Sequence, residues 1–175
     1  METTQYFTCI SYNTVDFLIQ SRYVVSGVYL FVPKEAKNVV FNRETLPHIH
    51  LSDLLEAEFL CAPVEQYNVA LIMKKDDFSS DVCQKIADFT ETAFPASGHL
   101  ALSLSGALTT KTIDEKQLRL LPLGIRTKIS ECGISAIGFE QQGKKQLLLS
   151  PDMLLRKFFA SGLLKAERPE LGGTQ

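Results

Sequence analysis

Two segments of this 175-residue chain repeat the same order of elements, and this repeat restricts the possible fold more than any other sequence feature. Each segment has an apolar run, a polar turn, a second apolar run, and then a serine followed by a leucine pair. The first covers residues 39–55 and the second covers residues 136–155. Apolar runs joined by a polar turn are typical of a β-hairpin, and a serine before such a pair is typical of a capped helical turn. The repeat therefore predicts two similar β units, each closed at one end by its leucine pair.

Apolar runs outside the repeat predict further strands. Residues 67–73 are apolar on both faces, which is typical of a central strand buried on both sides. Residues 100–104 alternate between leucine and small residues, so one face is expected to be buried. The other predicted strands are residues 6–10 and 17–19, which form a hairpin, and residues 23–32, which bend at Ser26-Gly27.

Two helices are expected among these strands. Apolar residues recur every three or four positions over residues 79–94, with Ser80 as a possible cap and Pro95 just beyond the end. A last helix is expected to begin at Ser150, which caps it, with a proline at the first helical position. The apolar stripe of the first helix is Val82, Ile86, Phe89 and Ala93; that of the second is Leu154, Leu155, Phe158 and Phe159, and Gly162 can terminate it.

Composition limits the classes of function. The net charge is −2 and the 18 basic residues are scattered, so no nucleic-acid partner is expected. No apolar run reaches the ~20 residues of a membrane helix, and no secretory signal is visible at the N-terminus. The four cysteines are far apart, which favours free thiols in a reducing compartment. We therefore expect a cytoplasmic protein that does not insert into membranes.

The order of these patterns resembles a divergent CheW-like domain, the adaptor family of bacterial chemotaxis arrays. The resemblance covers most of the chain and rests on short apolar motifs. These motifs are Phe7–Ile10 followed by Phe17–Ile19 and Val24; Leu46–Leu51 followed by Leu54 and Leu55; and Gly133–Ile137 through Leu147–Leu149 to Leu154 and Leu155.

The resemblance implies a mainly β fold of two packed, small five-stranded β-barrels with SH3-like halves. A single domain would cover residues 1–166, with one half at about residues 14–75 and the other at about residues 97–160. The helix at 79–94 would be an insert between the halves, a C-terminal helix would follow the last hairpin, and residues 167–175 would form a loose tail.

The resemblance also implies a non-enzymatic adaptor. Such a protein couples receptors to a histidine kinase through protein–protein contacts, so its partners would be a chemoreceptor signalling domain, a chemotaxis histidine kinase, or both. No cofactor is implied. The chain departs from the family at three places: Asn42-Arg43-Glu44 replaces an Asn-Leu-Arg-Gly turn, Ser26 replaces an acidic residue, and His50 replaces an aspartate.

Two groups of residues are candidates for partner binding. Phe41, Asn42 and Arg43 lie at a predicted hairpin tip, where the resembling family uses an arginine for partner contact. An arginine at a turn can bind a carboxylate through two hydrogen bonds, although a solvated turn residue is the simpler interpretation. Phe158 and Phe159 give the last helix more apolar surface than it needs to close one end of a β unit. They therefore either cover other elements or contact a partner, including a second copy in a homodimer.

A small-ligand or metal-binding β-barrel, possibly an enzyme, is the alternative hypothesis. His48 and His50 are two apart on a predicted strand, so both imidazoles face the same side, and His99 could supply a third ligand. The competing interpretation is a solvated strand face with Ile49 turned inward. A metal site is not our prediction, because His-x-His alone lacks the necessary number of ligands.

No catalytic motif is recognised. Ser103 and Ser105 share a predicted strand face before Gly106, but the Gly-x-Ser-x-Gly elbow of a serine nucleophile is missing. Residues 109–112 read Thr-Thr-Lys-Thr, which is similar to the end of a phosphate-binding loop, but the preceding glycines are missing. The sequence therefore favours a protein that is not an enzyme.

Overall fold

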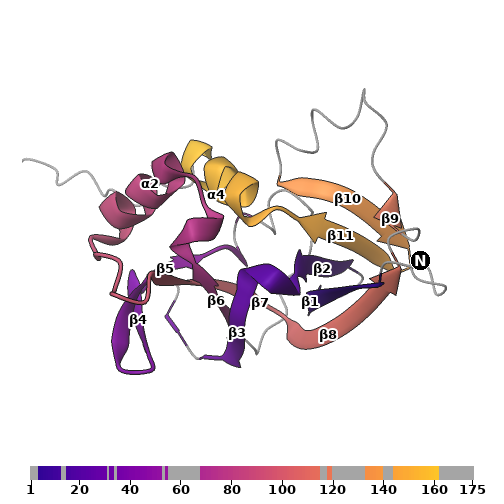
Figure 1. The fold of residues 1–175 in the computed structure, drawn as a ribbon, viewed down its shortest axis with the longest axis horizontal. Coiled ribbons are helices and arrows are strands. Elements are labelled where there is room, and N and C mark those ends of the chain that lie inside the picture. The colour runs from indigo at the N-terminus through magenta and orange to yellow at the C-terminus, as the bar shows by residue number, and fades with distance from the viewer. Residues whose placement is uncertain are drawn as a thin grey trace, which may run out of the picture.

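The computed structural model describes residues 4–12, 15–30, 32–33, 35–52, 54, 68–114, 118–119, 133–139 and 144–161. These residues form two β-sheets, and the two longer helices lie side by side over them (Figure 1). The prediction of a mainly β fold with two helices is confirmed.

Sheet A has six strands in the order β8-β1-β2-β11-β10-β9. Its neighbours are antiparallel except β2 and β11, which run parallel. Five consecutive side chains of β2 are buried, because this central strand is covered on both faces. The strands are β1 (Thr4–Tyr12), β2 (Val15–Gln20), β8 (Ala107–Asp114), β9 (Leu118–Arg119), β10 (Ile134–Phe139) and β11 (Lys145–Leu149).

Sheet B has five strands in the order β3-β6-β7-β5-β4. Here too one neighbouring pair is parallel, β5 with β7, and the others are antiparallel. The bend expected at Ser26-Gly27 lies in β3, where the pairing with β6 shifts register between Val24 and Ser26. The strands are β3 (Val24–Tyr29), β4 (Asn38–Phe41), β5 (Glu44–His50), β6 (Asn68–Lys74) and β7 (His99–Ser105).

The two sheets are copies of each other in strand order. Each strand of the first half has a counterpart in the second half: β1 corresponds to β6, β2 to β7, β3 to β8, β4 to β10 and β5 to β11. When every strand is exchanged with its counterpart, the order β8-β1-β2-β11-β10 of sheet A becomes the order β3-β6-β7-β5-β4 of sheet B. The parallel pair β2–β11 then corresponds to the parallel pair β7–β5. The predicted repeat is thus a real structural repeat, and its halves are interleaved, because each sheet takes strands from both.

The predicted five-stranded barrels require a correction. Among the described residues both sheets are open, because each half completes the sheet of the other half and does not close on itself. At one place the two edges meet. The side chain of Leu108 on β8 packs on Gly27 of β3, where an added Cβ would lie 2.7 Å from a leucine methyl group.

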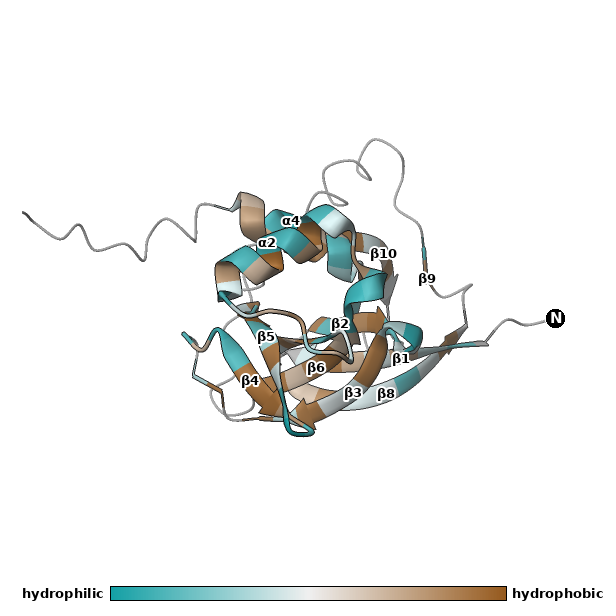
Figure 2. Ribbon diagram, turned by 60° about the vertical axis from the view of Figure 1, so that its left-hand side comes forward, coloured by the Kyte–Doolittle hydropathy of each residue, from teal (hydrophilic) through white to brown (hydrophobic). Residues whose placement is uncertain are grey.

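The main hydrophobic core lies between the sheets and beneath the helices. It contains residues from both sheets and both helices, including Phe17, Leu71, Leu102 and Leu155, which are at most 1% exposed. Two smaller clusters fill the other faces of the sheets, around Phe7 and Leu18 in sheet A and around Leu46 and Ile72 in sheet B. Apolar residues therefore cover much of the strands of sheet B in Figure 2.

Helix α2 (Ser80–Thr90) is shorter than the predicted helix at 79–94. Its cap is Ser79 and not Ser80, because the Ser79 hydroxyl accepts a hydrogen bond from the Val82 amide. It ends where Glu91 adopts the left-handed conformation, with φ of 52°. Two short 3-10 helices, η1 (Ser21–Tyr23) and η2 (Lys75–Asp77), follow β2 and β6.

Helix α4 (Pro151–Ala160) begins with proline at its start, as predicted, but the Ser150 side chain makes no capping hydrogen bond. The Ser150 amide instead donates to the carbonyl of Gly133, which fixes the start of α4 against β10. Leu154 and its repeat partner Leu54 are both 1% exposed, so both are buried as expected, but they lie in one shared core and do not each close a separate β unit. Leu55 lies outside the described residues, as do Gly162 and the predicted tail.

Candidate functional site

The first predicted group, Phe41, Asn42 and Arg43, lies at the tip of the β4–β5 hairpin. Asn42 and Arg43 are exposed and have positive φ angles of 49° and 68°, as a two-residue type I′ turn requires. The side chain of Val40 beside the turn is 68% exposed. Phe41 is only partly buried and packs on the core cluster of sheet B. The hairpin therefore presents a cation next to an exposed apolar side chain.

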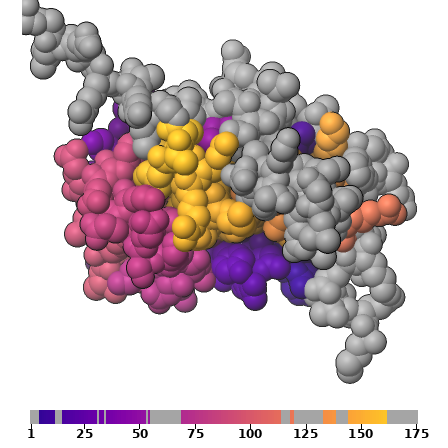
Figure 3. Space-filling view, turned by 90° about the horizontal axis from the view of Figure 1, so that it is seen from above, coloured from indigo at the N-terminus to yellow at the C-terminus, as the bar shows by residue number. Residues whose placement is uncertain are grey.

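The second predicted group, Phe158 and Phe159, lies on α4 and packs against α2. Both rings make edge contacts with Phe89, at centroid distances of 5.6 and 6.1 Å, and Phe158 is buried. Figure 3 shows α4 alongside α2 on this face of the molecule. These rings thus cover another element, which was one of the two interpretations left open, and Phe159 is the more accessible of the two.

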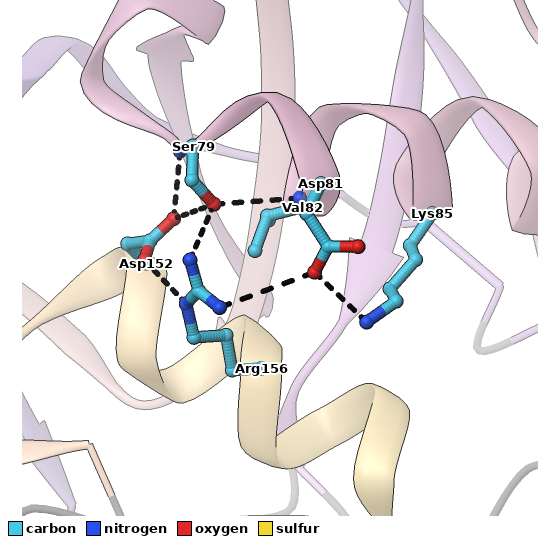
Figure 4. A network of polar contacts seen from close by, with 6 residues as sticks. All are labelled: Ser79, Asp81, Val82, Lys85, Asp152 and Arg156. Carbon is cyan, nitrogen blue, oxygen red and sulfur yellow. Dashed lines mark hydrogen bonds and ion pairs between the residues drawn. The ribbon is translucent and has the colours of Figure 1, made fainter.

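A polar clamp joins the first turns of the two helices (Figure 4). The Asp152 carboxylate accepts from the amide of Ser79 at 2.8 Å and from its hydroxyl at 3.0 Å. Arg156 donates to Asp152 and to Ser79, both at 2.8 Å, and lies 3.9 Å from Asp81. Burial alone would raise the pKa of Asp152, but the hydrogen bonds from Arg156 and Ser79 outweigh it and hold the pKa below its usual value.

The two predicted groups do not come together. The tip of the β4–β5 hairpin points away from the helix pair, which lies over the opposite end of that hairpin (Figure 1). At that end Lys37 donates to Glu91 at 2.6 Å and lies over the ring of Phe89 at 5.9 Å. Any partner contact at the tip and any contact at the helix pair therefore belong to separate surfaces.

The histidines on β5 form a hydrogen-bonded pair about one serine. His48 Nε2 lies 2.6 Å and His50 Nδ1 lies 2.8 Å from the hydroxyl of Ser103. His48 Nδ1 contacts the carbonyl of Ala36, which can only accept, so this nitrogen carries the proton. In a neutral His48 ring Nε2 is then unprotonated and accepts a hydrogen bond from the Ser103 hydroxyl. The oxygen of this hydroxyl in turn accepts a hydrogen bond from Nδ1 of His50. The expectation of a solvated strand face is wrong, because His48 and Ser103 are fully buried.

This geometry gives the two histidines a structural role. Both ring nitrogens of His48 are occupied by the contacts with Ala36 and Ser103. In the described part of the chain, no three His, Cys, Asp or Glu side chains are grouped so that they could hold a metal ion. His99, the suggested third ligand, lies at the start of β7 and pairs with Lys74.

The stability of the fold is expected to depend on pH through His48. Burial lowers the pKa of His48 below the usual 6.5 and outweighs the hydrogen bond to the Ala36 carbonyl, which acts in the opposite direction. The unfolded chain therefore binds a proton first as pH falls. The contribution of His48 is complete above pH 6.5 and decreases below it, by at most about 1.4 kcal/mol per pH unit. Urea unfolding between neutral and mildly acidic pH measures this slope.

The matched variant is His48→Asn, which keeps an amide donor near Ala36 and cannot titrate. It is expected to unfold more easily at all pH values but with a shallower pH dependence than the parent chain over this range. An unchanged slope would show that His48 is not the titrating group.

Sequence reasoning missed a buried ionic cluster in sheet A. Asp16 on β2 is fully buried, and its two carboxylate oxygens pair with Lys111 and Lys144, each at 2.6 Å. Ser11 donates to it at 2.7 Å. Burial would raise the pKa of Asp16, but the hydrogen bonds from Lys111, Lys144 and Ser11 dominate and lower it. The sequence did contain a sign of this cluster. Asp16 lies between the apolar residues Val15 and Phe17, and an aspartate buried in such a strand needs partners for its charge.

A groove of about 510 Å³ lies between the end of sheet A and the starts of α2 and α4. Arg22 and Tyr23 of η1 form one wall, with the guanidinium 4.7 Å from the ring centroid and donating to the hydroxyl at 2.6 Å. Asp77 and the clamp residue Asp152 lie on the lining as well. The groove therefore presents charges of both signs, and sequence reasoning did not identify it.

These features define a protein of two β-sheets built from interleaved halves, in which every buried polar side chain of the described residues has a hydrogen-bond partner. No protein-family model and no curated protein sequence matches the chain. Among solved structures, the crystal structure of the scaffolding protein TtCheW from Thermoanaerobacter tengcongensis aligns with a TM-score of 0.52 and 12% sequence identity. The alignment covers 87% of this chain and 92% of that chain. The chain therefore has a CheW-like fold.

The helices of the described residues are all too short or too polar to cross a membrane.

Proposed function

We propose that this chain is a non-enzymatic adaptor of the CheW type, working in the cytoplasm and coupling chemoreceptors to a histidine kinase through protein–protein contacts. The shared fold over most of both chains supports the proposal. An adaptor requires rigid surfaces and no convergent catalytic site, and two interleaved sheets over one core provide such surfaces.

The turn at Asn42-Arg43 is the observation that carries the proposal to particular residues. Arg43 has a positive φ of 68°, a conformation that glycine adopts at lower cost than a long side chain. An exposed arginine held in this conformation suggests a role for the side chain outside the fold. A guanidinium beside the exposed Val40 is suited to a protein surface that offers a carboxylate next to an apolar residue.

The direct test is capture of a purified chemoreceptor signalling domain and of a chemotaxis kinase regulatory domain on the immobilised chain. Binding of at least one is expected. Failure to bind either at high concentration would contradict the proposal. Phe159→Ala then tests the helix pair as a second surface, because this ring is more accessible than Phe158.

Replacing Arg43 by glycine is expected to separate stability from binding. The variant relieves the left-handed strain and should raise the free energy of unfolding by about 0.5–1 kcal/mol. At the same time it removes the guanidinium and should weaken partner binding at least about tenfold, or ~1.4 kcal/mol. Urea unfolding and titration calorimetry measure the two effects.

Arg119→Gly on β9 is the control for binding, since it removes another exposed arginine elsewhere on the molecule. If Arg43→Gly bound the partner as well as the control does, the hairpin tip would be excluded as the contact.

A further inference from the structure

We propose that the groove between the end of sheet A and the starts of α2 and α4 binds a small zwitterion, with the carboxylate of the ligand on Arg22 and its ammonium group on Asp77. The groove is separate from the contacts proposed for the adaptor, because neither Arg43 nor Phe159 lines it. A zwitterion could therefore bind whether or not the chain couples receptors to a kinase.

The strand order creates this groove. β2 and β11 are neighbours and run parallel, so their carboxyl ends lie side by side. Beyond these ends the chain leaves in two directions, from β2 through η1 to β3 of sheet B, and from β11 into α4. Gln20 and Leu149, the last residues of the two strands, accordingly line the groove. Crevices where the connections after neighbouring parallel strands diverge are the usual ligand sites of open α/β sheets.

The size of the groove suits a small molecule. Its volume of about 510 Å³ lies within the range of about 300–1,000 Å³ that is typical of small-molecule sites. Two charged side chains of opposite sign, Arg22 and Asp77, lie on the lining, and they come from different 3-10 helices. The character of the ligand therefore depends on whether these two charges are open to it.

Arg22 is held in position and keeps donors for a ligand. Its guanidinium lies 4.7 Å from the ring centroid of Tyr23, and Nη2 donates to the Tyr23 hydroxyl at 2.6 Å. Tyr23 packs against the main core, which fixes the ring. The other guanidinium N–H groups make no hydrogen bond with a described residue. A planar guanidinium stacked in this way is preorganised to bind a carboxylate through two hydrogen bonds.

Asp77 supplies the opposite charge. It is the last residue of η2 and precedes Phe78, which is 8% exposed in the main core and so fixes this turn. The Asp77 carboxylate is partly buried and makes no ion pair or hydrogen bond with a described residue. The other acid of the lining, Asp152, is already occupied, because its oxygens accept from Ser79 and Arg156 (Figure 4).

These two open charges select the class of ligand. A simple anion would bind Arg22 but would also meet the carboxylates of Asp77 and Asp152, and a simple cation would meet Arg22. An apolar ligand would displace water from both charges without replacing its hydrogen bonds. A zwitterion satisfies both groups at once. Free amino acids and short peptides carry an ammonium group and a carboxylate only a few bonds apart, so they are the two sources of this chemistry.

Isothermal titration calorimetry of the full chain with each of the protein amino acids, and separately with alanyl-alanine and glycyl-glycine, tests the proposal. At least one of these compounds is expected to bind with a dissociation constant below about 1 mM. The stronger of the two groups of compounds identifies the source of the ligand. If no compound of either group bound at about 10 mM, the proposal would be overturned.

Arg22→Gln and Asp77→Asn remove one charge each at nearly constant size. Each variant should weaken binding of the zwitterion at least about tenfold, because each loses a hydrogen bond between charged groups. Arg119→Gln is the matched control, since it neutralises an exposed arginine that does not line the groove, and it should bind like the parent. Circular dichroism and urea unfolding show whether the variants keep the fold.

Blocked ligands assign each charge to its partner. The carboxamide of the bound compound lacks the carboxylate, so it should bind the parent and Arg22→Gln equally weakly. The N-acetyl derivative lacks the ammonium group, so it should bind the parent and Asp77→Asn equally weakly. If a variant fails to fold, the blocked ligands still test the parent chain, where both should bind at least about tenfold more weakly than the zwitterion. Binding that survives both blocking groups, or both substitutions, would overturn the proposal.

Discussion

Replacing Gly133 by alanine is expected to lower the free energy of unfolding by about 3–4 kcal/mol. Gly133 has a φ of 82°, which strains any other residue. In addition, a Cβ at this position would lie 2.8 Å from the Cα and 2.9 Å from the nitrogen of Leu154. These are main-chain atoms of α4, so the helix itself would have to move away from β10.

Gly98→Ala is the matched control. Gly98 has a similar φ of 67°, but its added Cβ would meet only the flexible side chain of Lys75, at 3.3 Å. A loss of about 1 kcal/mol is expected from the backbone strain alone. Urea unfolding followed by circular dichroism compares the two variants. Equal losses would show that the close approach of α4 to Gly133 contributes nothing beyond the backbone conformation.

Replacing Asp16 by alanine is expected to lower the free energy of unfolding by about 3 kcal/mol at neutral pH. The substitution leaves Lys111 and Lys144 close together without the carboxylate that both bind at 2.6 Å. Both lysines are partly exposed, so they can turn toward water, which keeps the loss at the lower end of the range for a broken buried pair. Denaturant unfolding of the variant measures it.

The triple variant Asp16→Leu, Lys111→Met, Lys144→Met tests the reason for that loss. It removes all three charges, and it is expected to recover most of the stability, because apolar residues of similar size often replace a buried ionic group without penalty. If the triple variant were as unstable as Asp16→Ala, the loss would come from packing and not from unpaired charge. The lowered pKa of Asp16 adds a second signature: its contribution to stability is present above pH 3.8 and decreases as the pH falls below that value.

The repeated pattern was sufficient to predict a mainly β fold with a repeat, because a hairpin followed by a buried leucine is a local signal that does not depend on how the sheets are arranged. Leu54 and Leu154 accordingly reach the same core. What the pattern could not give is the pairing of strands far apart in sequence. The parallel pairs β2–β11 and β5–β7 join opposite halves, and no turn or spacing records them.

The errors at particular residues also arise because the sequence pattern does not show which distant segments come into contact. Strand β8 was overlooked because its threonines carry no apolar alternation, although an edge strand with one open side does not need it. His48 was expected at a solvated face because histidine is polar, yet Ser103 and Ala36 satisfy both of its nitrogens inside the fold. Of the predicted binding residues, Arg43 stays a candidate on the evidence of its backbone conformation.

The exchange of strands between the halves also dictates when the chain can acquire its structure during synthesis. Strand β2 leaves the ribosome early. The strand β11, which pairs with one of its two edges, is more than 120 residues away in the sequence. Contacts of such long range slow folding and leave apolar strand edges open until late. Truncation before the final hairpin would therefore produce an aggregation-prone fragment in place of an autonomous half, and unfolding of the complete chain should be a single cooperative event.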